Sequence, residues 1–300
     1  MRFAAVAALG LALTFASPAL AQQEPDAAAD VSVTRPAWPA GAGPVAALDE
    51  GHRNFHTLDG RYGPFAALLR SDGYQVRAAR GPITAESLKG VRVLMIANAR
   101  APEGSSSAFT LEEIAMLKAW VGQGGSLLLI ADHMPFAGAA TTLGQAFGFT
   151  FEDGYTQIPR EGPLPDIFTP GQGLGRHAVT TGRSASERID ELATFTGSAF
   201  TAPAGAVPIL TLPAGSKAIK PDAEGRIVRD GSGVDVGGWL QGAVMDYGKG
   251  RLAVFGEAGM FSAQIVRQND FRMGFNSPRA PRNKQFALNL LHWLSGGPAR

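Results

Sequence analysis

The stretch GGSLLLIADH, residues 124–133, decides the fold of this chain. Its uninterrupted apolar run, set between a Gly-Gly break and an Asp-His pair, is typical of a strand buried on both faces in the middle of a parallel sheet. In open α/β sheets, ligands bind beyond the carboxyl ends of the strands. The stretch therefore predicts a central strand followed directly by site residues, Asp132 and His133.

The segments around this strand predict an α/β architecture. Residues 44–49 and 91–97 are short apolar runs that indicate two further strands. Thr110 and Glu113 form a capping box, which opens a helix that ends at the glycines before the central strand. Strand, helix and strand at this spacing are a βαβ unit, which crosses over right-handed. We therefore expect a mostly parallel sheet with helices on both of its faces.

The C-terminal third adds an antiparallel extension and a last helix. Residues 239–247 and 251–255 flank Gly-Lys-Gly, which predicts a hairpin. Asn283 is placed to cap a helix that ends at Gly296, with apolar residues on one of its faces.

The N-terminus has the pattern of a secretory signal peptide. Met1 and Arg2 precede an apolar run that is too short to span a bilayer, and an A-x-A site ends at Ala21. We expect residues 1–21 to be removed and the protein to be periplasmic or secreted. The chain has no cysteine, so we expect neither a disulfide nor a lipid attachment that would anchor it to a membrane.

Charge and composition limit the kinds of partner and the number of domains that we expect. Lys and Arg number 27 against 26 Asp and Glu, without a basic stripe, which argues against a nucleic-acid partner. Residues 22–43 are rich in Ala, Pro and acids and lack periodicity, which predicts a flexible linker. Residues 44–300 then form a single domain, with a loop-rich insertion around 156–237 where Pro and Gly interrupt every pattern. The oligomeric state stays open.

Histidines follow the first predicted strand at a spacing that metal sites use. His52 and His56 are four residues apart, so two imidazoles can hold one divalent ion, and Asp49 supplies a carboxylate. This set predicts a metal centre, with zinc as the preferred ion and an open position for water. The alternative is that His52 and His56 only cap and cross-link a surface loop.

Candidate catalytic groups follow two other strands. Asp132 and His133 point to opposite faces if the strand continues, and face one cleft only if the chain turns after Ala131. His133 is then a general base or a metal ligand, with Asp132 orienting a partner imidazole; the alternative is that Asp132 caps the next helix. Glu257 ends a later strand between glycines, and a Glu at a buried strand end is uncommon without a partner.

Two polar residues are candidates for binding the substrate, and two common catalytic or nucleotide-binding motifs are missing from the sequence. Asn54 and Gln264 are expected to form hydrogen bonds with the substrate. The chain lacks the G-x-S-x-G motif of serine α/β-hydrolases and the P-loop motif of nucleotide-binding proteins.

Several segments of the chain resemble the class I glutamine amidotransferase-like superfamily, close to its exported ThuA-like branch. The resembling segments are VRVLMIANA (91–99), LEEIAMLKAWVGQGGSLLLIADH (111–133), YGKGRLAVFGEAGMF (247–261) and FALNLLHWLSG (286–296). The resemblance implies a flavodoxin-like sheet. Amidotransferases carry a catalytic Cys after the central strand, whereas this chain has Asp132 and His133 there and no Cys at all, which excludes glutamine hydrolysis by a thiolate.

Two functions follow from these residues. The first is an exported hydrolase, with or without a bound metal, that acts on a small ester, amide, lactone or sugar-derived substrate. The alternative is a non-catalytic module that uses the same polar groups to bind a carbohydrate or a protein partner. Geometry separates the two, because catalysis requires the groups to converge on one point.

Overall fold

The computed structural model describes residues 23–222, 224, 226–227 and 231–297. The expected signal peptide, residues 1–21, lies outside the described residues.

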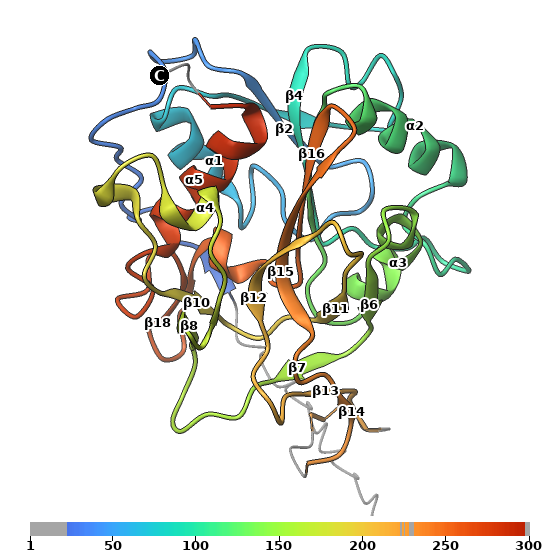
Figure 1. Cartoon of the computed structure of the whole chain (residues 1–300), viewed down its shortest axis with the longest axis vertical. Helices are drawn as coiled ribbons and strands as arrows, with labels where there is room; N and C mark the ends of the chain where they lie inside the picture. Colours follow the sequence, from blue (N-terminus) through green and yellow to red (C-terminus); the bar gives the residue numbers. More distant parts are fainter. Residues whose placement is uncertain (1–22, 223, 225, 228–230, 298–300) are drawn as a thin grey trace, which may run out of the picture.

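A large sheet runs through the middle of the molecule (Figure 1). Five neighbouring strands on one side of this sheet are parallel, and their order, starting from the edge, is β3 (Gln75–Ala79), β2 (Val45–Asp49), β4 (Val91–Ala97), β5 (Ser126–Ile130) and β16 (Gly250–Phe255). Strand β5 lies between β4 and β16, and all of its residues are buried. The position predicted for residues 124–133 is therefore confirmed, and its physical reason is that an apolar run of this kind needs cover on both faces.

The sheet continues beyond β16 as a mostly antiparallel extension, in which only β8 and β9 pair in parallel among the described strands. Strand β15 (Leu240–Tyr247) forms the predicted hairpin with β16 and pairs on its other side with β12 (Val207–Thr211). Beyond β12 lie β9 (Gly173–Leu174), β8 (Asp166–Pro170) and β10 (Leu192–Thr194), while β11 (Ala199–Thr201) and β6 (Thr150–Glu152) extend the sheet beside β15. The chain is thus a mixed α/β protein whose large sheet is parallel on one side and mostly antiparallel on the other.

Two smaller antiparallel sheets lie outside the large one. One contains β1 (Gln23–Pro25), β17 (Ala263–Val266) and β18 (Phe271–Gly274), and the other contains β14 (Val234–Asp235), β13 (Lys217–Ile219) and β7 (Tyr155–Gln157). Residues 156–237, expected as a loop-rich insertion, thus hold several short strands among their loops. These strands have two to five residues, too few to show a period, and most of their pairing partners lie far away in the sequence.

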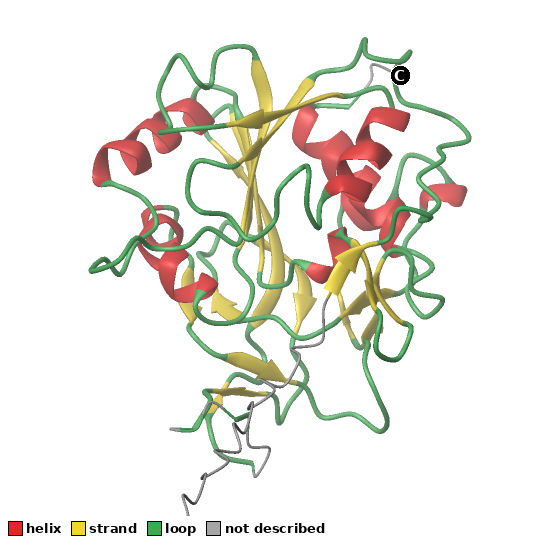
Figure 2. Cartoon of the chain, turned by 180° about the vertical axis from the view of Figure 1, so that it is seen from behind, coloured by secondary structure: helices red, strands yellow, loops and turns green. Residues whose placement is uncertain are grey.

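Helices cover both faces of the sheet, as Figures 1 and 2 show. Helices α1 (Gly63–Ser71) and α5 (Asn283–Ser295) share a core with Leu48 and Met95 of the sheet. Helices α2 (Leu111–Gly122) and α3 (Phe136–Ala146) share the other core with Leu94 and Leu129. Shorter turns are α4 (Ala178–Thr181), η1 (Ala185–Glu187) and η2 (Gly259–Phe261). Among the described residues, no helix is long and apolar enough to cross a membrane.

The two predicted helix caps have different outcomes. The capping box is confirmed: Thr110 Oγ1 accepts from Glu113 N at 3.2 Å, and Glu113 Oε2 accepts from Thr110 N at 3.0 Å. The cap predicted at Asn283 is wrong, because Arg282 takes the N-cap position without a side-chain cap. The Asn283 amide instead bonds to both backbone groups of Ala193 on β10, a partner that local sequence does not reveal.

Residues 23–43 are part of the packed domain rather than a flexible linker. Strand β1 pairs with β17, and the buried Asp26 accepts from the amide of Asn276 at 2.9 Å. The ring of Trp38 packs edge-on against Tyr74, with 4.6 Å between the ring centroids. The sequence of this segment shows no hydrophobic period, because the segment contacts the rest of the domain through isolated residues rather than through one continuous apolar face.

Candidate functional site

A cavity of about 90 Å³ lies where the parallel strands present their carboxyl ends. A volume of this size has room for several water molecules. Its lining combines polar groups from the ends of β2, β4, β5 and β16 with aromatic rings: Gln23, Phe55, His56, Asn98, Asp132, His133, Phe136, Phe195, Thr196, Glu257, Gly259, Gln264 and Met273. The structure therefore brings together Asp132, His133, Glu257, His56 and Gln264 of the predicted site residues.

Asp132 is held in place by backbone groups from two strand ends. Its Oδ1 accepts from His133 N at 2.7 Å, and its Oδ2 accepts from Ala258 N at 3.1 Å. Asp132 N itself donates to the side chain of Asn98 at 3.0 Å. The chain turns here as required, because Asp132 and His133 line the same cavity. The alternative role as a helix cap is wrong, since Pro135 is the N-cap of α3 and no side chain caps it.

One ring nitrogen of His133, Nδ1, has a hydrogen-bond partner among the described residues, and the other, Nε2, is a candidate group for contacting the ligand. Its Nδ1 lies 2.7 Å from the carbonyl oxygen of Met134. A carbonyl only accepts, so Nδ1 carries the proton and a neutral ring leaves its Nε2 lone pair available. The ring stacks on Tyr155, with 4.1 Å between centroids. His133 is therefore oriented for a role as base or hydrogen-bond acceptor.

Glu257 is buried beneath the cavity and bound by the first turn of η2. Its Oε1 accepts from Gly259 N and its Oε2 from Met260 N, both at 2.7 Å. A Cβ at position 259 would lie 2.6 Å from Oε1, so this close approach requires glycine. Burial, and then the nearby carboxylate of Asp132, raise the pKa of Glu257 well above its ordinary value. The hydrogen bonds from the backbone N–H groups of Met260 and Gly259 oppose this shift but do not reverse it. A raised pKa favours the protonated carboxyl group, which is able to donate a proton.

His56 is buried in the wall of the cavity without a polar partner for Nδ1 among the described residues. Its ring lies 4.4 Å from that of Tyr62, centroid to centroid. Burial, with smaller effects of Arg61 and His133, lowers the pKa of His56 to about 3. The ring is therefore neutral at pH 7 and offers unused hydrogen-bonding capacity beside the carboxyl pair.

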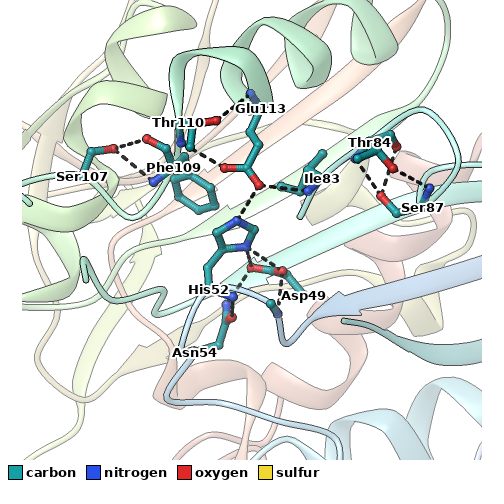
Figure 3. A network of polar contacts seen from close by, with 11 residues as sticks. Asp49, His52, Asn54, Ile83, Thr84, Ser87, Ser107, Phe109, Thr110 and Glu113 are labelled. Carbon is teal, nitrogen blue, oxygen red and sulfur yellow. Dashed lines mark hydrogen bonds and ion pairs between the residues drawn. The ribbon is translucent and has the colours of Figure 1, made fainter. Parts of the chain in front are cut away.

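A second polar cluster, the His52 network, is drawn in Figure 3. Its members Asp49, His52, Asn54 and Glu113 are not among the residues that line the cavity. His52 Nδ1 is 2.9 Å from both oxygens of Asp49, and Nε2 is 3.0 Å from Glu113 Oε1. Asn54 donates to Asp49 Oδ2 at 3.0 Å and accepts from His52 N at 3.0 Å. Burial opposes charge on His52, but the hydrogen bonds and charges of Asp49 and Glu113 outweigh it and raise the pKa of His52.

The predicted metal ligands are divided between these two places. Both ring nitrogens of His52 are occupied by carboxylates, while His56 lines the cavity. The chain turns at Arg53, whose φ of 52° is left-handed, so the four-residue spacing is not that of a helix face. In the described part of the chain, no group of three or more His, Asp and Glu is arranged to hold a metal ion. His52 and His56 therefore have different surroundings in this structure, and Asn54 is placed in the His52 network rather than in the cavity.

Two residues that the sequence did not single out as site residues matter here. Glu113 was recognised only for its capping box, yet it also holds His52. Asn98 follows β4 directly, has a left-handed φ of 52°, and positions Asp132. The signal for Asn98 was present, because a polar residue directly after a buried strand had already pointed to Asp49 and Asp132.

No protein-family model matches the chain, and no curated protein sequence matches it. Among solved structures, the N-terminal domain of mmIFT52 is similar with a TM-score of 0.61 and 17% identity, over 85% of this chain and 99% of that chain. Cytoplasmic protein STM3548 from Salmonella typhimurium is similar with a TM-score of 0.49 and 16% identity, over 86% and 100% of the two chains. A protein described as ThuA-like from Bacteroides uniformis has a TM-score of 0.46 and 14% identity, over 87% and 93%. Likeness at this level of identity concerns the fold.

Proposed function

We propose that this chain is a hydrolase that acts on a small ester, amide, lactone or sugar-derived substrate in the cavity at the carboxyl edge of its sheet. The observation that carries the proposal is convergence: Asp132, His133 and Glu257, from two strand ends, line one cavity together with His56. In many enzymes, two carboxyl groups in different surroundings have different pKa values, so that one acts as the acid and the other as the base.

The roles follow from the hydrogen bonds of each group. Asp132 takes a proton from a water molecule as the water oxygen attacks the substrate's carbonyl or anomeric carbon. Glu257, whose pKa is raised by burial, gives its proton to the leaving oxygen or nitrogen as that bond breaks. His133 Nε2 is a second acceptor for the water, and the buried Oε1 of Gln264, which lacks a partner among the described residues, accepts from a substrate hydroxyl or amide.

We also propose that the protein is related to the amidotransferase-like proteins and that it is periplasmic or secreted. The parallel strands, numbered in chain order, lie in the sheet as 2-1-3-4-5, which is the flavodoxin-like order and supports the likeness to amidotransferase-like proteins. The signal-peptide pattern of residues 1–21 supports a periplasmic or secreted hydrolase.

Replacing Glu257 by Gln tests the proposal. The purified protein is assayed on 4-nitrophenyl esters, anilides, lactones and 4-nitrophenyl glycosides. We expect the variant to lose at least ~100-fold in kcat/KM on any substrate turned over, because the amide side chain of Gln has no acidic proton to give. Exposed Glu103 provides the matched control, Glu103→Gln, which should keep wild-type activity. Circular dichroism verifies folding, because Gln loses one of the two accepted hydrogen bonds. Turnover by Glu257→Gln at the wild-type rate, or no turnover of the panel by the wild type, contradicts the proposal.

A binding module for a carbohydrate or a protein partner is the second candidate function. The rings of Phe55, Phe136 and Phe195 line the cavity near the unused amide oxygen of Gln264, a combination that suits an apolar face carrying hydroxyl groups. Calorimetric titration with mono- and disaccharides separates the candidates. A binding module binds such a sugar without turnover, and Glu257→Gln then only weakens the binding.

A further inference from the structure

Two arginines lie against the aromatic wall of the cavity. The guanidinium carbon of Arg61 is 4.1 Å from the ring centroid of Phe55, and that of Arg100 is 4.9 Å from the same centroid. Arg100 also lies 5.4 Å from the centroid of Phe136. Both rings line the cavity, and the two arginines, which are not among its lining residues, lie against these rings.

Neither guanidinium group has a carboxylate partner among the described residues. Other arginines of the chain do pair with acids: Arg160 with Asp166 at 2.8 Å, and Arg282 with Asp190 at 3.0 Å. The Nε of Arg61 is buried and has no hydrogen-bond partner in the described part of the chain. A buried donor left unpaired costs about 1–3 kcal/mol, and more when it is charged.

The two cations also act on each other. Burial, and then the charge of Arg100, lower the pKa of Arg61 from its ordinary value, but an arginine side chain remains charged in proteins. The contacts with Phe55 offset part of this repulsion, by roughly 0.5–2 kcal/mol each. Only an anion both removes the repulsion and satisfies the unpaired donor.

We propose that Arg61 and Arg100 form an anion subsite at the edge of the cavity, which binds a carboxylate or phosphate group of the ligand. Planar guanidinium groups match both oxyanions through paired N–H donors. The charge of Arg61 contributes to lowering the pKa of His56, and His56 and Phe55 both line the cavity. The inference rests on the proposed function in naming its substrate class, an anionic ester, amide or glycoside, although anion binding itself does not depend on catalysis.

Titration with inorganic phosphate and with succinate, followed by calorimetry at low ionic strength, tests the subsite in the full-length protein. We expect the wild type to bind at least one of the two anions, and Arg61→Gln and Arg100→Gln each to weaken that binding at least tenfold. Arg61→Lys, which keeps the charge but loses the planar fork, should weaken it less than Arg61→Gln. Arg100 is exposed, so its replacement leaves the fold intact and keeps the test decisive if Arg61→Gln unfolds.

Arg176 supplies the matched control, because it is an exposed arginine that lines a different cavity, together with Thr181 and Arg188. Arg176→Gln should bind the anion with wild-type affinity. Tighter binding of phosphate assigns a phosphate group to the ligand, and tighter binding of succinate assigns a carboxylate. Binding of neither anion by the wild type, or an equal loss in Arg176→Gln, overturns the subsite. Anion binding that depends on Arg61 in a protein without hydrolase activity upholds the subsite and rejects the proposed function.

Discussion

His52 and His56 lie four residues apart on one loop and have opposite surroundings. His52 is held between Asp49 and Glu113, with both ring nitrogens in hydrogen bonds. His56 lines the cavity, and its buried Nδ1 has no partner among the described residues. Carboxylates raise the pKa of the first, although burial opposes them, whereas burial lowers the pKa of the second to about 3.

The difference separates a group that holds the loop from one that faces a ligand. A buried histidine with every nitrogen bonded lowers the energy of one loop conformation and has nothing left to offer a substrate. A buried histidine with an unused nitrogen is unfavourable for the empty protein and useful only when a ligand arrives. The His52 network therefore shapes the loop that carries Phe55 and His56 into the cavity wall.

Removing the His52 side chain should have the largest effect on stability. In His52→Ala, the buried carboxylates of Asp49 and Glu113 lose the partner between them, and we expect the free energy of unfolding to fall by about 3 kcal/mol. Urea unfolding at pH 7 measures this change.

The control is His56→Ala, which removes a ring but no hydrogen bond to Nδ1. It should destabilise the protein less than His52→Ala and should impair activity or ligand binding in the folded protein. The comparison fails if His56→Ala lowers the free energy of unfolding as much as His52→Ala does.

The two histidines should give the protein opposite responses to pH. The folded pKa of His56 is about 3 against about 6.5 when unfolded, so its contribution to stability is present above pH 6.5 and is lost as the pH falls toward 3. At pH 5 the loss is about 2 kcal/mol, from 1.36 kcal/mol per pKa unit. The folded pKa of His52 is raised, so its contribution is full below pH 6.5 and is lost as the pH rises through that pKa.

Unfolding free energies at pH 5 and pH 7.5 measure both effects by difference. Relative to His56→Gln, the wild type should lose about 2 kcal/mol on going from pH 7.5 to pH 5. Relative to His52→Gln, it should gain stability over the same interval. The same sign for both variants would contradict the assignment of opposite surroundings.

The sequence predicted the elements whose signals are local. The apolar run of β5, the capping box at Thr110 and the hairpin between β15 and β16 each depend on neighbouring residues, and all three are confirmed. The packing of residues 23–43 and the partner of Asn283 depend on segments far away in the chain, which no window of sequence contains.

The site was predictable to the extent that strand ends define it. Parallel strands bring Asp132 and Glu257 to one edge whatever the loops do, and both line the cavity. The metal set could not be judged from spacing, because Arg53 turns the loop between His52 and His56. Arg61 and Arg100 belong to no sequence motif. Their shared contact with the ring of Phe55 is visible only in the structure.

The smallest expected effect concerns the helix cap at the edge of the His52 network. Thr110→Ala removes the hydroxyl that accepts from Glu113 N, and we expect the free energy of unfolding to fall by about 1 kcal/mol. The carboxylate of Glu113 should stay in place, because the backbone N–H groups of Thr110 and Ile83 still donate to it at 3.0 and 2.9 Å. Thr110→Ser, which keeps the hydroxyl, serves as the control and should lose less than half as much. Urea unfolding of Thr110→Ala, measured alone and together with His52→Ala, checks this. If Thr110→Ala lowered the free energy of unfolding as much as His52→Ala does, the Thr110 hydroxyl would stabilise the whole network through Glu113. The loop would then be held in place by its contact with α2 rather than by its contact with Asp49.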